Sequence, residues 1–139
     1  MKVAGLILAA GESRRMGSPK ALLRYGSQTF LDTLISLFVP RCAPVIAVLG
    51  AHAAEIRAAA NHDAIFVENP DYQRGMTTSL QCGLQAIPED VDAVLFTLVD
   101  HPAVSPQTVD ALLAVNHPDS LLRVPRYREK RGQDRKSVV

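Results

Sequence analysis

Three segments of the sequence combine glycine or proline with charged side chains in a way that could bind a phosphorylated ligand. They are residues 8–20, 68–80 and 92–102. In the first, glycines leave backbone N–H groups free to converge on phosphate oxygens, and cationic side chains can neutralise the phosphate charge. The third ends in an acidic turn that could hold a divalent cation. Phosphate binding with a metal ion is therefore the chemistry that these residue types favour.

The first segment reads Leu-Ala-Ala-Gly-Glu-Ser-Arg-Arg-Met-Gly-Ser-Pro-Lys over residues 8–20. It places no Lys-Ser or Lys-Thr after a second glycine, so it is not a Walker A loop. The Gly-x-Gly-x-x-Gly fingerprint of dinucleotide-binding proteins is also absent from the sequence. On residue types alone, a solvated loop in which Ser13 caps a helix remains an alternative.

The second segment, residues 68–80, ends where a helix is expected to begin. Thr78 and Gln81 have the spacing of a capping box, which predicts a helix start near Thr78. Backbone amides and this helix N-terminus could form a polar wall for an anion. Two other interpretations stay open: Met76 could fill a gap in the core, and Ser79 could face solvent in the first turn.

The third segment places Asp100 at the end of a largely apolar run, residues 93–99. An unpaired carboxylate is costly in such a place. A Mg²⁺ ion would give it a partner, because Mg²⁺ commonly takes one or two carboxylates together with substrate phosphates. The alternative is an aspartate that caps the following turn. Asp92 lies about 25 Å from Asp100 along an extended strand, so it belongs to the opposite edge of the sheet.

An alternation of apolar strands and amphipathic helices must position these segments. Strands are expected at residues 3–10, 45–49, 64–67, 93–99 and 121–124, and helices at 30–38, at 51–60, from Thr78, and from Ser105 as N-cap with Pro106 as first helical residue. This alternation predicts an α/β fold, a Rossmann-like three-layer sandwich with a mostly parallel sheet. Ligands of such sheets bind outside the carboxyl ends of the strands, where all three segments fall.

Composition argues against several other classes of partner. The chain has 139 residues, which suits one domain, and 47% hydrophobic content, which suits one core. We expect no binding to nucleic acid or to a membrane, because the net charge is only +1 and the chain has few aromatic residues and no tryptophan. The apolar run at residues 3–10 fits a buried strand better than a signal peptide. Cys42 and Cys82 fit no zinc spacing and are expected to be buried, so the expected location is the cytoplasm.

The complete motifs resemble those of the MobA-like nucleotidyltransferase superfamily. The first segment matches its signature loop, Leu-x-x-Gly-x-x-x-Arg-Met-Gly-x-x-Lys. Residues 75–84 resemble the Gly-Met-x-x-Ser-Leu-x-x-Gly-Leu segment of the molybdenum cofactor cytidylyltransferase branch. Leu-Val-Asp-x-Pro at residues 98–102 resembles the metal-binding turn of the superfamily. The resemblance extends over residues 3–132, and residues 1–132 are expected to form one MobA-like domain that lacks its C-terminal part.

The resemblance implies a role for each matching residue. Lys20 would reach the α-phosphate and the acceptor phosphate, Arg15 would hold the β- and γ-phosphates, and Asp100 would bind Mg²⁺. Fixed positive charge is needed because one phosphate anion attacks another. The implied nucleotide-binding residues are Leu8, Ala9, Ala10, Gly11, Glu12, Ser13, Arg14, Met16, Gly17, Gly75, Met76 and Ser79.

The reaction implied by the resemblance is transfer of CMP from CTP to molybdenum cofactor (molybdopterin), with release of pyrophosphate. Ala10 stands where the guanylyl branch has a second glycine, which favours cytidine. His101 is interpreted as a loop residue, because a phosphate nucleophile is already an anion and needs little proton transfer. The alternatives are another sugar- or alcohol-phosphate nucleotidyltransferase, or a non-catalytic nucleotide-binding fragment or maturation factor for a molybdenum hydroxylase.

The last seven residues, 133–139, depart from the family pattern. Relatives continue after the position of Gly132 with further helices and strands that ordinarily help to bind the acceptor and complete the metal site. We therefore expect the chain as given to bind nucleotide more readily than it turns substrate over.

Overall fold

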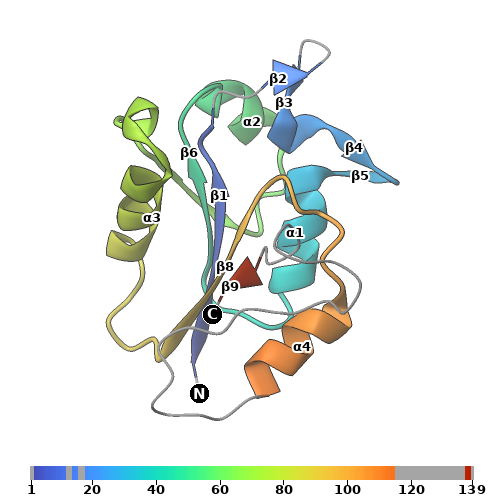
Figure 1. The fold of residues 1–139 in the computed structure, drawn as a ribbon, viewed down its shortest axis with the longest axis vertical. Coiled ribbons are helices and arrows are strands. Elements are labelled where there is room, and N and C mark those ends of the chain that lie inside the picture. The colour runs from blue at the N-terminus through green and yellow to red at the C-terminus, as the bar shows by residue number, and fades with distance from the viewer. Residues whose placement is uncertain (1, 12–13, 16–17, 115–136, 139) are drawn as a thin grey trace.

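The computed structural model describes residues 2–11, 14–15, 18–114 and 137–138 (Figure 1). The strands are β1 (Val3–Ala9), β2 (Arg14–Arg15), β3 (Ser18–Pro19), β4 (Arg24–Tyr25), β5 (Gln28–Thr29), β6 (Val45–Leu49), β7 (Ile65–Glu68), β8 (Ala93–Leu98) and β9 (Ser137–Val138). The helices are α1 (Phe30–Phe38), α2 (Ala53–Ala59), α3 (Met76–Gln85) and α4 (Pro106–Ala114), and 3-10 turns occur at Lys20–Leu22 and Tyr72–Arg74.

The central sheet has the strand order β7-β6-β1-β8-β9. The first four of these strands run parallel, and β9 pairs antiparallel with β8. All seven residues of β1 are buried, as a continuous apolar run in a central parallel strand predicts. Leu8 is paired with Val48 on one side and with Leu98 on the other, so β1, β6 and β8 end at the same edge of the sheet.

Helices cover both faces of this sheet, which confirms the predicted three-layer α/β architecture. Alternate residues of β1 point to opposite faces: Ile7 packs in a core with α1 and α4, and Leu6 packs in a second core beneath α3. Figure 1 shows α3 on one side of the strands and α1 and α4 on the other. Ile56 of α2 belongs to the same core as Ile7.

Two glycines allow the helices to approach the sheet closely. A Cβ atom at Gly5 would stand 2.7 Å from Cδ2 of Phe38, the aromatic residue that ends α1. A Cβ atom at Gly83 would overlap the Leu6 side chain, so α3 can pack on β1 only because Gly83 has no side chain. These contacts hold both helix layers at a fixed distance from the strands that carry the functional edge.

The start of α3 lies two residues before Thr78, and the predicted capping box is wrong. The helix begins at Met76, and its N-cap is Gly75, whose φ of 117° is accessible chiefly to glycine. Thr78 forms no capping box; its hydroxyl lies 2.7 Å from the Gly75 carbonyl oxygen, to which it donates. The turn at Tyr72–Arg74 leads into Gly75, whose carbonyl accepts from the Thr78 backbone N–H at 3.1 Å, so the helix is already under way at Thr78.

Most other predicted elements are confirmed within one or two residues. Ser105 caps α4, because its hydroxyl accepts from the Thr108 backbone N–H at 3.1 Å, and Pro106 is the first helical residue. Asp92 lies at the opposite edge of the sheet from Asp100, where it accepts from the Lys2 backbone N–H. The strand expected at residues 121–124 lies outside the described residues. The pairing of β9 with β8 falls within residues 133–139 and was not predicted.

The two cysteines differ in their surroundings. Cys42 is buried as predicted, and burial raises the pKa of its thiol to about 11. Cys82 is only half-buried, so the expectation of two fully buried cysteines is half wrong. Neither forms a disulfide, and the thiol of Cys42 is therefore a core atom rather than a reactive group.

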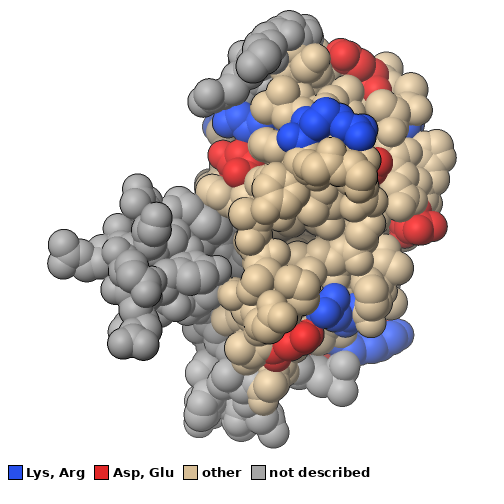
Figure 2. Space-filling model, turned by 90° about the vertical axis from the view of Figure 1, so that its right-hand side faces the viewer, with Lys and Arg blue, Asp and Glu red and all other residues tan. Residues whose placement is uncertain are grey.

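The charged residues are dispersed on the side of the molecule that carries α1 and α4. Figure 2 shows its Lys and Arg residues in separate small groups, with acidic residues between them and uncharged residues over most of the surface. This side of the described chain therefore presents no continuous basic surface of the kind that binds a nucleic-acid backbone. Of the helices in the described part, none is long and apolar enough to cross a membrane.

Candidate functional site

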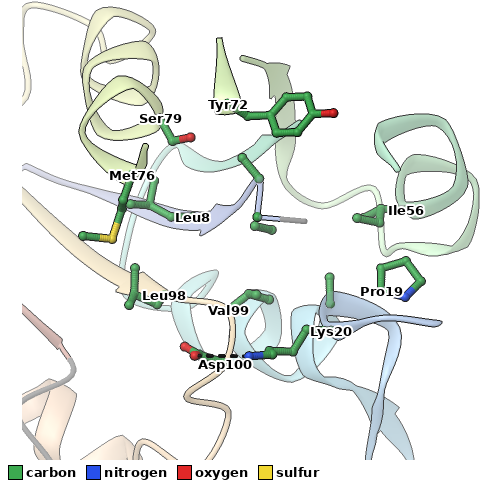
Figure 3. Close-up of a pocket in the computed structure, with 14 residues that line it drawn as sticks. Leu8, Pro19, Lys20, Ile56, Tyr72, Met76, Ser79, Leu98, Val99 and Asp100 are labelled. Atoms are coloured by element: carbon green, nitrogen blue, oxygen red, sulfur yellow. Dashed lines mark ion pairs between the residues drawn. The ribbon is translucent and has the colours of Figure 1, made fainter. Parts of the chain in front are cut away.

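A cavity of about 230 Å³ opens at the carboxyl ends of β1 and β8 (Figure 3). Strands β6 and β8 lie on opposite sides of β1, so the order of strands reverses here, and ligands of open α/β sheets bind at such a point. The cavity is lined by Leu8, Ala9, Ala10, Gly11, Pro19, Lys20, Ala21, Ile56, Tyr72, Met76, Ser79, Leu98, Val99 and Asp100. Residues from all three predicted segments therefore meet in one site.

The end of β1 and the residues that follow it form the floor of this cavity. Leu8, Ala9, Ala10 and Gly11, which are predicted to bind nucleotide, all line it. The Ala10 carbonyl accepts from the Ala51 backbone N–H at 3.2 Å, which ties this loop to the segment after β6. Small side chains here leave room for a ligand to approach the backbone closely.

The rest of the signature loop is described only in part. Arg14 and Arg15 form β2, which pairs antiparallel with Ser18 and Pro19 of β3, so the loop folds back on itself before it reaches Lys20. The predicted phosphate-binding residues Glu12, Ser13, Met16 and Gly17 lie outside the described residues. The roles assigned to these residues and to the arginine side chains stay predictions.

Lys20 and Asp100 face each other across the cavity mouth. The Lys20 Nζ atom lies 3.7 Å from Oδ2 of Asp100, and Figure 3 shows this pair below the apolar part of the lining. Their side chains are 23% and 37% exposed, so a ligand can reach both. Two residues 80 positions apart in sequence are thus one charged pair, because β1 and β8 are neighbouring parallel strands.

The imidazole of His101 adjoins this pair. Nε2 of His101 lies 3.2 Å from Oδ1 of Asp100. The Asp100 carboxylate therefore has a lysine on one oxygen and an imidazole on the other. The sequence indicated only a loop residue at position 101, and its adjacency to Asp100 was the one available signal of this contact.

Asp100 is the one predicted metal ligand at the cavity, and a divalent cation there would have to take most of its ligands from water and substrate. In residues 2–11, 14–15, 18–114 and 137–138, no three His, Cys, Asp or Glu side chains form a group that could hold a metal ion. An ion at Asp100 would need water and phosphate oxygens for its other positions. Mg²⁺ is typically bound in that way, by one or two carboxylates and the phosphates of a substrate.

The wall opposite Lys20 comes from the first turn of α3 and from the 3-10 turn before it. Met76 is 58% exposed at the cavity, which excludes the interpretation as a core residue, and Ser79 is 4% exposed, which excludes a solvent-facing side chain. Gly75 is not part of the lining and instead forms the turn before α3.

Sequence reasoning gave no site role to several side chains of this cavity, among them those of Tyr72 and Ile56. The Tyr72 ring lies against Gly50, where a Cβ atom would stand 2.6 Å from Cβ of Tyr72. Tyr72 lies within the polar segment at residues 68–80, which was the only signal for it. Ile56 comes from the apolar face of α2 and gave no functional signal at all.

Several curated relatives are similar to this chain. It is 39% identical to the nicotine blue oxidoreductase of Paenarthrobacter nicotinovorans over 84% of this chain and 58% of that protein. It is 36% identical to a probable molybdenum cofactor guanylyltransferase of Mycolicibacterium paratuberculosis over 81% of this chain and 57% of that protein. It is also 36% identical to the molybdenum cofactor cytidylyltransferase of Escherichia coli, over 59% of this chain and 44% of the relative. The chain thus spans about half the length of these relatives.

Solved structures share the fold. The crystal structure of Rv0371c from Mycobacterium tuberculosis superposes with a TM-score of 0.81 at 28% identity, over 99% of this chain and 70% of that one. A manganese complex of the same protein has a TM-score of 0.71 at 27% identity, over 89% of this chain and 64% of that one. A family model described as the MobA-like NTP transferase domain matches residues 5–134. With these motifs meeting in one cavity, the chain belongs to the MobA-like NTP transferase family.

Proposed function

We propose that this chain is the nucleotide-binding part of a nucleotidyltransferase that moves CMP from CTP to molybdenum cofactor (molybdopterin). The observation that carries the proposal is the pairing of Lys20 with Asp100 at 3.7 Å, beside the loop after β1 and inside one cavity. A triphosphate requires fixed positive charge and a carboxylate that can hold a metal ion, and this pair offers both.

In the proposed reaction a phosphate oxygen of the acceptor attacks the α-phosphorus of CTP. The new O–P bond forms as the bond from the α-phosphorus to the bridging oxygen breaks, and pyrophosphate leaves with that electron pair. Lys20 would neutralise charge between the two reacting phosphates, and no protein base is needed because the nucleophile is already an anion. Mg²⁺ bound at Asp100 would supply further positive charge to the phosphate oxygens.

The choice of CTP over GTP is part of the proposal, since relatives named for each nucleotide are both 36% identical to the chain over the residues that they match. Ala10 narrows the cavity floor where the guanylyl branch has glycine, which favours the smaller pyrimidine. We expect CTP to bind more tightly than GTP in parallel calorimetric titrations with Mg²⁺. Tighter GTP binding would move the chain to the guanylyl branch, and no binding of either would overturn the proposed function.

Arg15→Ala is expected to weaken the binding of the triphosphate and to leave the binding of the monophosphate unchanged. If Arg15 holds the β- and γ-phosphates, the variant should bind CTP about 10- to 150-fold more weakly, the scale of one charged hydrogen bond, and should bind CMP as the parent does. Titration of the two ligands against both proteins measures this. An equal loss for CTP and CMP would contradict the assignment of Arg15.

A redox function is the second candidate, because a relative at 39% identity is named as an oxidoreductase. A reaction of that class needs an electron carrier, whereas the proposed transfer needs a triphosphate. Adding NADPH to the same titration series distinguishes the two. Binding of NADPH without binding of CTP or GTP would favour the redox candidate.

A further inference from the structure

Asn69 is a buried polar residue that contacts the cavity-lining Ser79 and that the proposed reaction does not use. It directly follows β7 and is 4% exposed. Its backbone N–H donates to the Leu49 carbonyl at 2.7 Å, so the residue is held by the neighbouring strand β6. A buried amide must satisfy all its hydrogen-bonding groups, and its partners reveal what it orients.

The orientation of the Asn69 amide is fixed by a backbone donor. The Asp71 N–H, which can only donate, lies 2.9 Å from Asn69 Oδ1. Rotating the amide by 180° would place its NH₂ group against this N–H. The NH₂ group therefore faces the opposite way, where it donates to the hydroxyls of Thr78 and Ser79, each at 2.9 Å.

The Ser79 hydroxyl must then donate to something other than Asn69. Its oxygen accepts from the amide, so its own hydrogen points elsewhere. Thr78 has carbonyl acceptors at Gly75 and Asp71, 2.7 and 3.0 Å away. No described residue offers Ser79 a comparable acceptor, although Ser79 is 4% exposed and lines the cavity. Figure 3 shows Ser79 at the cavity edge, on the same side as Tyr72.

We propose that Asn69 is a positioning residue that makes Ser79 a hydrogen-bond donor into the cavity, aimed at an acceptor atom of the nucleobase. The inference rests on the proposed function and adds a selection rule to it. A base that presents a carbonyl or ring acceptor at this edge is bound, and one that presents only a donor leaves a buried hydroxyl unsatisfied. The amide thus sets the polarity of the base contact without touching the nucleotide.

Asn69→Asp tests this because it replaces the NH₂ donor of the side chain by an acceptor oxygen and leaves the shape of the side chain nearly unchanged. The carboxylate still accepts from the Asp71 N–H, but it can only accept from Ser79, whose hydrogen is then drawn away from the cavity. We expect roughly tenfold weaker binding of CTP and unchanged binding of inorganic tripolyphosphate, which has no base. Asn69→Ala, which removes the donor without adding charge, should weaken CTP binding less, by about threefold.

Asn61→Asp is the matched control. Asn61 makes the same turn, with its side-chain oxygen 2.8 Å from the Asp63 N–H, but it precedes β7 at the other end of the strand. This variant should bind CTP as the parent does, and melting temperatures of all variants report any loss of fold.

Ser79→Ala tests whether Asn69 acts on CTP binding through the Ser79 hydroxyl or only supports the fold. It should weaken CTP binding about tenfold, and Asn69→Asp should then cost nothing further in the double variant. An additional loss in the double variant, an equal loss for tripolyphosphate, or full CTP affinity in both Asn69 variants would overturn the inference. Absence of CTP binding by the parent protein would instead overturn the proposed function.

Discussion

Lys20→Ala is expected to weaken CTP binding by about 10- to 150-fold, the scale of a lost charged hydrogen bond. The variant removes the cation 3.7 Å from the Asp100 carboxylate, so that carboxylate then faces the triphosphate without its partner. CMP should lose affinity as well, because Lys20 is assigned to the α-phosphate, which both ligands carry. Calorimetric titration of CTP and CMP in Mg²⁺ measures both losses.

Lys2→Ala is the control for the loss of one positive charge. Lys2 pairs with Asp90 at the opposite edge of the sheet, and both side chains are exposed. This variant has the same net charge as Lys20→Ala and should bind both ligands as the parent does. Retention of full CTP affinity in Lys20→Ala would show that this lysine does not contact the nucleotide.

Asp100→Asn is expected to weaken CTP binding in the presence of Mg²⁺ and to strengthen it in the absence of metal. In Mg²⁺, CTP binding should fall roughly 100-fold, because the carboxylate that would hold the ion is gone. In EDTA, CTP should bind somewhat more tightly than to the parent, because one negative charge beside the triphosphate has been removed. Titrations in the two buffers, with melting curves for each protein, check this reversal.

Asp110→Asn provides the comparison for Asp100→Asn. The Asp110 carboxylate accepts from Arg41 at 2.7 Å, and this hydrogen bond lowers its pKa, so the substitution also breaks a carboxylate–cation pair. Asp110 lies on α4, outside the cavity lining. CTP affinity should be unchanged in either buffer. If Asp100→Asn behaves in the same way, Asp100 is not a metal ligand.

The sequence determined the main elements of the fold because their signals are local. A continuous apolar run predicted β1, which is buried on both faces, and Ser105 followed by Pro106 predicted the start of α4. The rule that ligands bind at the carboxyl edge of a parallel sheet placed the segments of Lys20 and Asp100 at one edge, and the structure adds their contact. Each of these inferences depends on a few neighbouring residues or on a general property of parallel sheets.

The sequence predicted the start of α3 less well, because two local signals for a helix start lie close together. Thr78 and Gln81 predicted the start of α3, but the left-handed conformation of Gly75 starts the helix at Met76. That conformation is open to a glycine in many settings, and only the preceding turn at Tyr72–Arg74 selects it here.

Only the tertiary structure decided which side chains complete the site. Tyr72 reaches the cavity because Gly50, on another segment, leaves space for its ring, and Ile56 reaches it from a helix that carries no motif. The donor role of Ser79 depends on an amide ten residues earlier, whose orientation is fixed by the Asp71 N–H. The spacing of residues along a chain specifies local conformation. The hydrogen-bond partner of a buried polar atom depends instead on how separate elements pack, and neighbouring residues in the sequence do not reveal it.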